Sequence, residues 1–239
     1  MKPTASPCVT CPHREGGFCG SLLHVPSLSS GSAAQRGWQR FFAAKPSEQI
    51  ATRNQTSADV FVLCTGWAFR FLQLPNGRRQ ILKFLMPGDL FSTASIFEDQ
   101  FHYSAKAVTA VQISALERSE IRVRCAENPD IWDTISRSCV EESHMADELT
   151  CVLGQRSAEE RIAYLFLHLM RRIEARSVVR DWRYPLPLRQ QHIADAVGLT
   201  PVHVSRVLRL FRDRGICDFS ENVLAVRNPA ELNRIGSLG

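Results

Sequence analysis

The stretch RQQHIADAVGLTPVHVSRVLRLFRDRGI, residues 189–216, decides the fold of the C-terminal part of the chain. Its apolar spacing predicts two short helices joined by a tight turn, the first of them over residues 188–197. Gly198 suits the turn, because glycine accepts the positive φ that a sharp helix end requires. Thr200 is placed to cap the second helix, with Pro201 at its first position. The stretch therefore predicts a helix-turn-helix, a motif whose second helix enters the major groove of DNA.

The second helix of this stretch has an apolar and a polar face. Four apolar side chains are predicted to be buried: Val204, Val207, Leu208 and Phe211. Five candidate DNA-contacting residues lie on the other face: Val202, His203, Ser205, Arg206 and Arg209. Arg206 is the best candidate for a bidentate contact with guanine, and Ser205 can bond a base or a phosphate. Val202 offers only apolar contact, and Arg209, Arg212 and Arg214 are expected at phosphates or in solvent.

The flanking segments complete a predicted DNA-binding domain over residues 157–239. Ser157 followed by Glu160 predicts the start of a helix. After the helix-turn-helix, a hairpin with its turn at residues 220–222 predicts the wing of a winged helix, and residues 229–235 predict a short final helix. The domain holds 13 Arg and no Lys against 9 acidic residues, an excess that favours a polyanionic partner.

Residues 21–127 are predicted to form a sensor domain. Short strand-like runs separated by turn signals fill residues 46–121, and this spacing favours a β-barrel or jelly roll. Residues 33–44, which precede them, suit a short helix. The apolar face of that helix would hold three aromatic residues: Trp38, Phe41 and Phe42.

Residues 128–156 change to the helical period. Asn128 can cap this helix, with Pro129 at its first position. Its apolar stripe has six members: Ile131, Ile135, Cys139, Met145, Leu149 and Val152. A long helix between two domains with one apolar stripe favours pairing with a second copy, so we predict a dimerisation helix. The alternative is a helix that packs only on its own sensor domain.

Three of the eight cysteines are grouped in the N-terminal segment, residues 1–20, as Cys8-x2-Cys11-x7-Cys19. Thiolates grouped this closely suit a soft metal ion or an iron–sulfur cluster, and such a site normally needs four ligands. Candidates for the fourth ligand are His13, Cys64 and Cys125. The alternative is a redox-labile tail that binds nothing.

The bulk composition indicates a folded protein. A hydrophobic content of 44% over 239 residues allows a packed core. No apolar run approaches the roughly 20 residues that span a bilayer, and the beginning, MKPTASPCVT, lacks the apolar region of a signal peptide. The sequence shows no paired catalytic carboxylates, nucleophile elbow or phosphate-binding glycine loop. We therefore expect a cytoplasmic protein that is not an enzyme, with a zinc module or a metal-dependent enzyme as the less favoured alternative.

Taken in order, these parts predict an α+β protein with a barrel or jelly-roll sensor domain, a long helix and a winged helix-turn-helix. Over residues 20–235, the chain resembles the CRP/FNR family of bacterial transcription regulators. Three stretches carry the resemblance: GDLF at 88–91, SAEERIA at 157–163 and IADAVGLTPVHVSRVLRLFRDRGI at 193–216. The resemblance implies a homodimer that binds a two-fold symmetric site on double-stranded DNA and contacts RNA polymerase.

The resemblance also identifies two pairs of residues at positions that bind a cyclic nucleotide in some members of the family. Cyclic-nucleotide binders of the family carry a Gly-Glu pair after the barrel turn and an Arg-Ser pair in the pocket. The matching pairs here are Ser92-Thr93 and Tyr103-Ser104. Since the Glu and the Arg are missing, the resemblance implies that no cyclic nucleotide binds.

The cysteine segment resembles the oxygen-sensing FNR-type branch, whose members hold a [4Fe–4S] cluster on three N-terminal cysteines and a fourth in the barrel. The resemblance implies Cys8, Cys11 and Cys19 as ligands. The fourth position matches Ser114, and Cys125 would take its place.

The recognition helix departs from the FNR pattern at one residue. FNR-like helices carry Glu-x-x-Ser-Arg, and this chain keeps Ser205 and Arg206 but has Val202 at the Glu position. A carboxylate there accepts a bond from cytosine N4 or adenine N6, and valine does not. We expect a different base preference at that position.

Two hypotheses for the signal follow. In the first, a [4Fe–4S] cluster responds to oxygen or redox state and favours the dimer. In the second, the chain is a FixK-like regulator without a cluster, controlled by thiol oxidation, by another ligand such as nitric oxide or haem, or by its own expression level.

Overall fold

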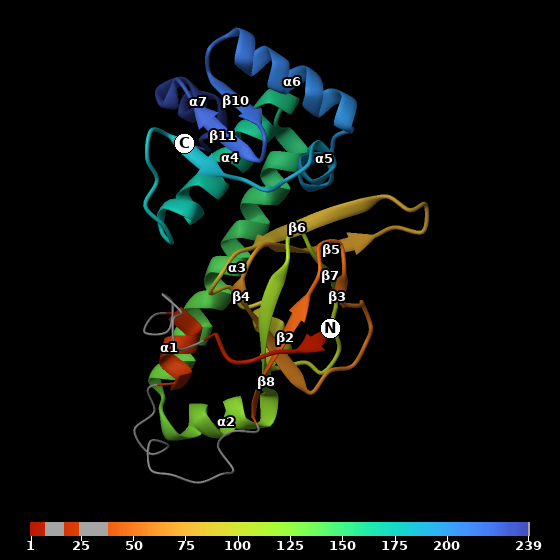
Figure 1. The fold of residues 1–239 in the computed structure, drawn as a ribbon, viewed down its shortest axis with the longest axis vertical. Helices are drawn as coiled ribbons and strands as arrows, with labels where there is room; N and C mark the ends of the chain where they lie inside the picture. Colours follow the sequence, from red (N-terminus) through yellow and green to blue (C-terminus); the bar gives the residue numbers. More distant parts are fainter. Residues whose placement is uncertain (8–16, 24–37, 239) are drawn as a thin grey trace. The chain divides into compact units, whose positions relative to one another are not determined.

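The computed structural model describes residues 1–7, 17–23 and 38–238 (Figure 1). The chain divides into two compact units. The first holds Met1–Leu72 and Lys83–His144, and the second holds Gln73–Leu82 and Met145–Gly239. In the part of the chain that the structure describes, every helix is too short or too polar to span a bilayer.

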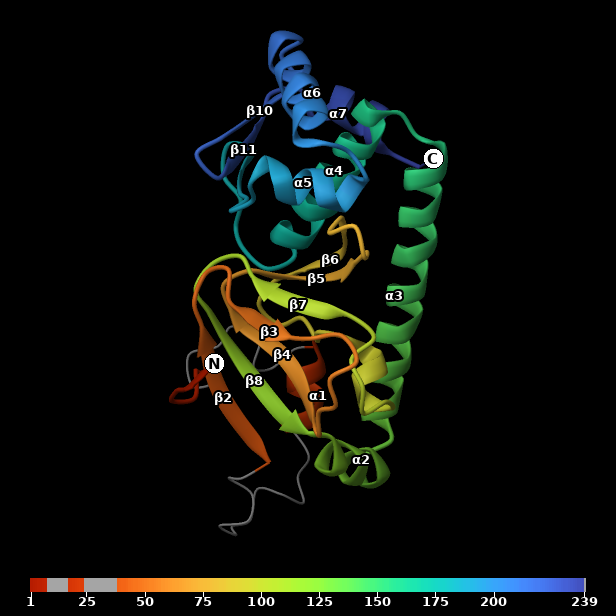
Figure 2. The same ribbon diagram turned by 90° about the vertical axis from the view of Figure 1, so that its right-hand side faces the viewer.

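Eight strands form two four-stranded sheets, seven of them in the predicted sensor domain and one, β1, in the N-terminal segment (Figure 2). The strand order of one sheet is β1 (Lys2–Pro3), β2 (Gln39–Ala44), β8 (Val111–Glu117) and β4 (Asp59–Thr65). The order of the other is β3 (Gln49–Ala51), β7 (Ser104–Ala107), β5 (Ala68–Gln73) and β6 (Arg79–Leu85). This is an antiparallel sheet domain of the expected class, built from two sheets instead of one closed barrel among the described strands.

Strand β2 lies where the sequence suggested the end of a helix over residues 33–44. Phe41 on β2 lies opposite Ser114 of β8, and the strand pairs with β8 along its whole length. The helix prediction was wrong because aromatic residues that suit an amphipathic helix also suit a sheet face, and pairing with a distant strand decides between them. Residues 33–37 of the predicted helix lie outside the described residues.

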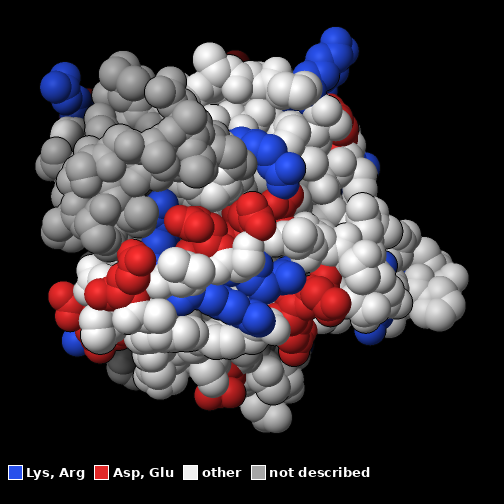
Figure 3. All heavy atoms as spheres, turned by 90° about the horizontal axis from the view of Figure 1, so that it is seen from below, with Lys and Arg blue, Asp and Glu red and all other residues white. Residues whose placement is uncertain are grey.

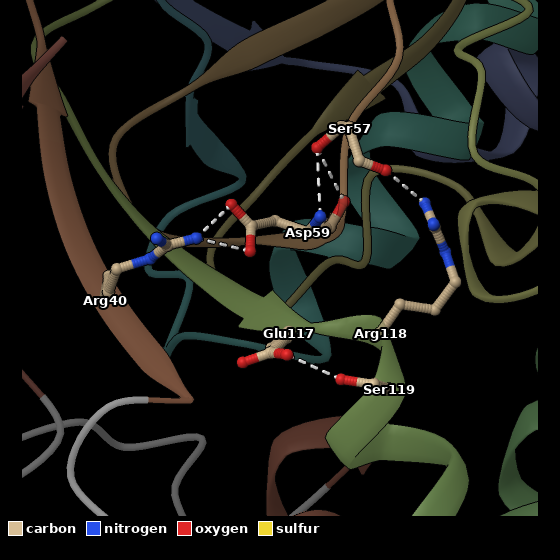
Figure 4. Close-up of polar contacts among 6 residues, drawn as sticks. All are labelled: Arg40, Ser57, Asp59, Glu117, Arg118 and Ser119. Atoms are coloured by element: carbon tan, nitrogen blue, oxygen red, sulfur yellow. Dashed lines mark hydrogen bonds and ion pairs between the residues drawn. The ribbon is translucent and has the colours of Figure 1, made fainter.

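Helix α2 (Arg118–Glu127) follows β8 directly, and the sequence did not indicate it. The Arg118 guanidinium donates to the carbonyl oxygen of Ser57 at 2.7 Å. Figure 4 shows this bond together with two further contacts at the same end of the sheet: Arg40 with Asp59, and Ser119 with Glu117. The Arg118 bond joins the start of α2 to the residues before β4, and the Arg40–Asp59 contact joins β2 to β4.

An apolar core joins α1 (Gly17–Leu23), α2 and the start of α3 (Asp130–Gln155) to the first sheet. Its buried members are Phe18, Leu22, Trp38, Val60, Val62, Leu90, Ile96, Leu116, Ile121, Cys125, Ile131 and Ile135. Arg124 lies buried beside this core, with its guanidinium 4.0 Å from the ring centroid of Trp38. It also donates to the carbonyl oxygen of Leu22 at 3.1 Å, which holds α1 against α2.

Helix α3 fills nearly all of the predicted range 128–156. The side-chain oxygen of Asn128 accepts a hydrogen bond from the N–H of Asp130 at 3.1 Å, which confirms the predicted cap. Within the predicted apolar stripe, Ile131 and Val152 are each 0% exposed in the single chain. The buried members therefore pack on the chain itself, whereas Cys139, Met145 and Leu149 are only half-buried, and pairing with a second copy stays a prediction.

The second unit contains the predicted winged helix-turn-helix. Its helices are α4 (Ala158–Glu174), α5 (Gln190–Val197), α6 (Pro201–Asp213) and α7 (Pro229–Gly236). Its sheet has the order β10 (Cys217–Ser220), β11 (Val223–Val226) and β9 (Arg183–Pro185). The turn between β10 and β11 holds Glu221 and Asn222 at φ 51° and 61°, which confirms the predicted hairpin.

Candidate nucleic-acid interface

The turn between α5 and α6 has the predicted geometry. Gly198 ends α5 in the left-handed region, with φ 65° and ψ 34°. The Thr200 side-chain oxygen accepts a hydrogen bond from the N–H of His203 at 3.3 Å, and Pro201 is the first residue of α6. Both local signals in the sequence are confirmed, because a positive-φ glycine and an N-cap act through their nearest neighbours alone.

Helix α6 has the two faces that its sequence predicts. Val204 and Phe211 are 0% exposed, and Val207 and Leu208 are 7% exposed. The five candidate DNA-contacting residues all have exposed side chains: Val202, His203, Ser205, Arg206 and Arg209. The buried face fixes the rotation of α6 about its axis, and this rotation turns the candidate residues outward together.

The arginines of α6 fall into two groups. Arg212 pairs with Asp218 at 2.7 Å, a contact that places it against strand β10. Arg206 and Arg209 form no ion pair or hydrogen bond with any other described residue. Their guanidinium groups are therefore available to an external acceptor, whereas that of Arg212 is committed within the domain.

Arg214 follows α6 and is also committed. It pairs with Glu159 of α4 at 3.2 Å. The sequence predicts both Arg212 and Arg214 at phosphates or in solvent. In the structure each guanidinium instead forms an ion pair within the domain, and this pair competes with any contact to DNA. Acidic partners 6 and 55 residues away in sequence were not identifiable before the fold was known.

His203 has a local role in addition to its predicted one. Its Nδ1 lies 2.9 Å from the Thr200 side-chain oxygen, so one ring nitrogen is engaged in the cap of α6. The other nitrogen, Nε2, is the atom left for a base or phosphate. An exposed ring held by its own helix cap presents that nitrogen in a restricted orientation.

One face of the molecule carries charges of both signs. Figure 3 shows basic and acidic side chains side by side on this face. Such a mixed face gives a polyanion no uniformly positive surface. The unpaired arginines of α6 are a better candidate for DNA contact.

The predicted metal ligands are only partly within the described residues. Cys8, Cys11 and His13 lie outside them. Cys19 on α1 packs against the apolar core that contains Cys125. Burial raises the pKa of the Cys125 thiol.

The structure also describes Ser114 and Cys64, two further positions considered for the fourth ligand. Ser114, which matches the fourth cysteine of the FNR-type branch, is buried and accepts a hydrogen bond from Gln39 Nε2 at 2.9 Å. Cys64 lies on β4 and is not a member of the core that holds Cys125. Within residues 1–7, 17–23 and 38–238, no three or more His, Cys, Asp or Glu side chains are grouped to hold a metal ion.

The positions that match the cyclic-nucleotide pocket are engaged within the chain. Thr93 donates from its hydroxyl to the carboxylate of Glu142 at 2.6 Å. The ring of Tyr103 lies beneath the guanidinium of Arg70, whose central carbon is 5.2 Å from the ring centroid. Sequence reasoning named Thr93 and Tyr103 but not Arg70 or Glu142, because these two lie on different elements far apart in the chain.

Comparison with known proteins agrees with this architecture. A family model for a cyclic nucleotide-binding domain matches residues 42–128, and one for a Crp-like helix-turn-helix domain matches residues 160–235. The solved structure of FixK2 from Bradyrhizobium japonicum has the same fold, with a TM-score of 0.76 and 24% identity. That similarity covers 84% of this chain and 98% of the FixK2 chain.

Two curated relatives extend over most of the chain. The nitrogen fixation regulation protein FixK of Bradyrhizobium diazoefficiens is 25% identical over 237 residues, covering 99% of this chain and 97% of FixK. The transcriptional activatory protein AadR of Rhodopseudomonas palustris is 31% identical over 214 residues, covering 86% of this chain and 87% of AadR. With both domains matched and this likeness along nearly its whole length, the chain belongs to the CRP/FNR family of DNA-binding transcription regulators.

Proposed function

We propose that this regulator works as a homodimer in which each copy of α6 reads one half of a two-fold symmetric DNA site. The observation that carries the proposal is the outward face of α6, where Arg206 and Arg209 are exposed and unpaired among the described residues. Arg206 donates to the base edge, preferably guanine, and Arg209 supports the contact at the backbone. The bound dimer then contacts RNA polymerase, as the family resemblance implies.

A face of α3 supports the pairing of two copies. The stripe that the sequence predicted for this role is buried at Ile131, Ile135 and Val152 and half-buried at its other members. A second stripe is exposed: Ser136, Val140, Ser143, Asp147 and Cys151. Val140, at 53% exposure, is its largest apolar member. These residues recur at steps of three and four, so they share one side of the helix. Pairing through this side brings two reading helices to one DNA site, where both bind at once.

Selection of bound duplexes from a random-sequence pool tests the proposal. The full-length protein is expected to enrich sites with two inverted half-sites, their centres about 10 base pairs apart or a multiple of that spacing. Sedimentation of the complex should give two protein chains per duplex. Enrichment of sites without two-fold symmetry, or no enrichment at all, contradicts the proposal.

The signal is a separate proposal, in which the N-terminal cysteines hold an iron–sulfur cluster that responds to oxygen or redox state. Cys19 and Cys125 support it, because both lie at the same apolar core of the sensor domain. The cluster would supply redox chemistry, and the chain would hold it through Cys8, Cys11, Cys19 and Cys125. Cys125 is 1% exposed within the apolar core, and this burial weighs against it as the fourth ligand and favours the FixK-like alternative without a cluster.

Anaerobic purification separates these accounts of the signal. A cluster predicts broad visible absorbance with stoichiometric iron and acid-labile sulfide, all lost in Cys11→Ser. A colourless protein that contains zinc assigns the cysteines to a zinc site. A protein with neither zinc nor acid-labile sulfide supports the FixK-like account.

A further inference from the structure

The sensor domain contains a buried cluster of charged groups around one carboxylate. Glu142, in the middle of α3, lies 3.3 Å from Nη1 of Arg70 on β5 and 3.2 Å from Nζ of Lys83 on β6. Thr93, at the start of the short 3-10 helix Thr93–Ile96, donates to the same carboxylate from its N–H at 3.2 Å and from its hydroxyl. Three separate elements of the sensor domain thus converge on a single side chain of α3.

The burial of these groups makes their pairing important. The side chains of Arg70, Lys83 and Glu142 are 10%, 13% and 17% exposed. Burial raises the pKa of Glu142, but Arg70, Lys83 and Thr93 together outweigh this effect and hold its pKa below the ordinary value. Removal of one partner from such a buried group leaves the others with uncompensated charge, which is strongly unfavourable. The carboxylate of Glu142 is therefore ionised, and the buried charges of Arg70 and Lys83 depend on it for compensation.

The two cations outnumber the carboxylate that they share. Arg70 is further placed over the ring of Tyr103, and its Nε has no hydrogen-bond partner among the described residues. The sensor domain thus offers a preformed position for an anion, lined by Arg70, Lys83 and Thr93. The anion that occupies this position is part of the chain.

The position of Glu142 on α3 connects this site to the proposed dimer face. Val140 precedes it by two residues and points to solvent with 53% exposure. Two residues correspond to about 200° of rotation around a helix, so the two side chains lie on nearly opposite sides. The anchoring of Glu142 to the sheet therefore fixes which side of α3 faces outward.

We propose that Glu142 is a built-in ligand of the sensor domain, which holds α3 in its DNA-binding orientation without a small-molecule effector. The proposal rests on the proposed function, since it assigns the control of α3 in the same dimeric DNA reader. The proposal treats Arg70, Lys83 and Thr93 as an anion-binding site that the carboxylate of Glu142 occupies. If the carboxylate of Glu142 is removed by substitution, a free carboxylate of the same size should bind in its place.

Glu142→Ala tests this directly, because the substitution deletes a CH2–COO⁻ group, which is the size of acetate. Binding of the full-length protein to a selected duplex is measured by fluorescence anisotropy, in acetate and in chloride of equal ionic strength. In chloride, Glu142→Ala is expected to bind about tenfold more weakly, since a smaller fraction of the protein is in the competent state. Acetate should restore most of the affinity. The control is Glu141→Ala, an exposed neighbour on α3, which should bind as the unchanged protein does in both salts.

Thermal unfolding of the same proteins without DNA gives a second readout. Glu142→Ala should unfold at a lower temperature, and acetate should raise that temperature more than chloride does. This readout applies even if the unchanged protein binds no duplex, an outcome that would overturn the proposed function alone. If Glu142→Ala does not fold, Glu142→Gln is measured by both methods and must show the same losses in chloride. Variants of Glu142 that bind and melt like the unchanged protein, or a Glu142→Ala protein on which acetate has no more effect than chloride, overturn the inference.

Discussion

Ser157 and Glu160 cap each other at the first turn of α4. The Glu160 carboxylate accepts a hydrogen bond from the N–H of Ser157 at 2.9 Å, and the Ser157 hydroxyl accepts one from the N–H of Glu160 at 3.4 Å. The hydrogen bonds with Ser157 and the neighbouring Arg156 lower the pKa of Glu160 to about 2. The sequence predicted this cap, and it fixes where the DNA-binding domain begins.

Ser157→Ala is expected to lower the free energy of unfolding by about 1 kcal/mol at neutral pH. The ionised form of Glu160 is favoured by folding, so its contribution is complete above the ordinary pKa of a glutamate. That contribution is lost as the pH falls towards about 2, the pKa in the folded protein. In Ser157→Ala the pKa of Glu160, followed by NMR, should rise towards the ordinary value. Ser205→Ala, an exposed serine within α6, serves as the control and should leave stability nearly unchanged.

Gly236 of α7 packs closely against the backbone of α4. A Cβ added there would lie 2.6 Å from the carbonyl carbon of Ala163 and 2.7 Å from the backbone nitrogen of Tyr164. Gly236→Ala should therefore separate the two helices and destabilise the DNA-binding domain by about 1–3 kcal/mol, as measured by urea unfolding. Gly154→Ala is the matched control, since nothing lies within 4 Å of its added Cβ. Equal stability of the two variants would contradict the close packing of α7.

Two cysteines should differ in how their reactivity depends on protein concentration. Cys151 is exposed on α3 in the single chain, whereas Cys217 is buried. Burial and the nearby Asp218 raise the pKa of Cys217 to about 12. Alkylation of Cys151, read by mass spectrometry, should slow as the protein concentration rises and dimers form. Cys217 should react slowly at every concentration until the protein is unfolded. A Cys151 rate independent of concentration argues against pairing through this side of α3.

Local signals and distant partners explain what the sequence could and could not predict. The turn at Gly198, the cap at Thr200 and the amphipathic α6 depend on neighbouring residues, and all three were predicted. The residues of β2 were misread as part of a helix, because Phe41 becomes part of a strand only through its pairing with Ser114. The contact of Glu142 with Arg70 joins residues far apart in sequence, and no local sequence pattern predicts it. Predictions from sequence succeed here where the determining interaction is short-range.

Val202→Glu should change the base preference of α6. Val202 is 60% exposed near the start of the helix, where an added carboxylate can reach a base edge. A glutamate there can accept from cytosine N4 or adenine N6, so binding should shift towards the half-site read by FNR-like helices. The affinity gained on that half-site is expected to be about 1–3 kcal/mol relative to the site of the unchanged protein. Fluorescence anisotropy on duplexes that differ at that base pair alone measures the shift. If the unchanged protein already prefers the FNR-type half-site, the expectation fails.

The most direct test of DNA reading by α6 compares two arginines on that helix. The ratio of affinities for a selected duplex and a scrambled one is measured for the unchanged protein, Arg206→Ala and Arg212→Ala. Arg206 is unpaired among the described residues, so its loss should reduce the ratio by about tenfold or more, the effect of one bidentate base contact. Arg212 is paired with Asp218, so its loss should leave the ratio nearly unchanged. An Arg206→Ala protein that keeps the full ratio would contradict the account.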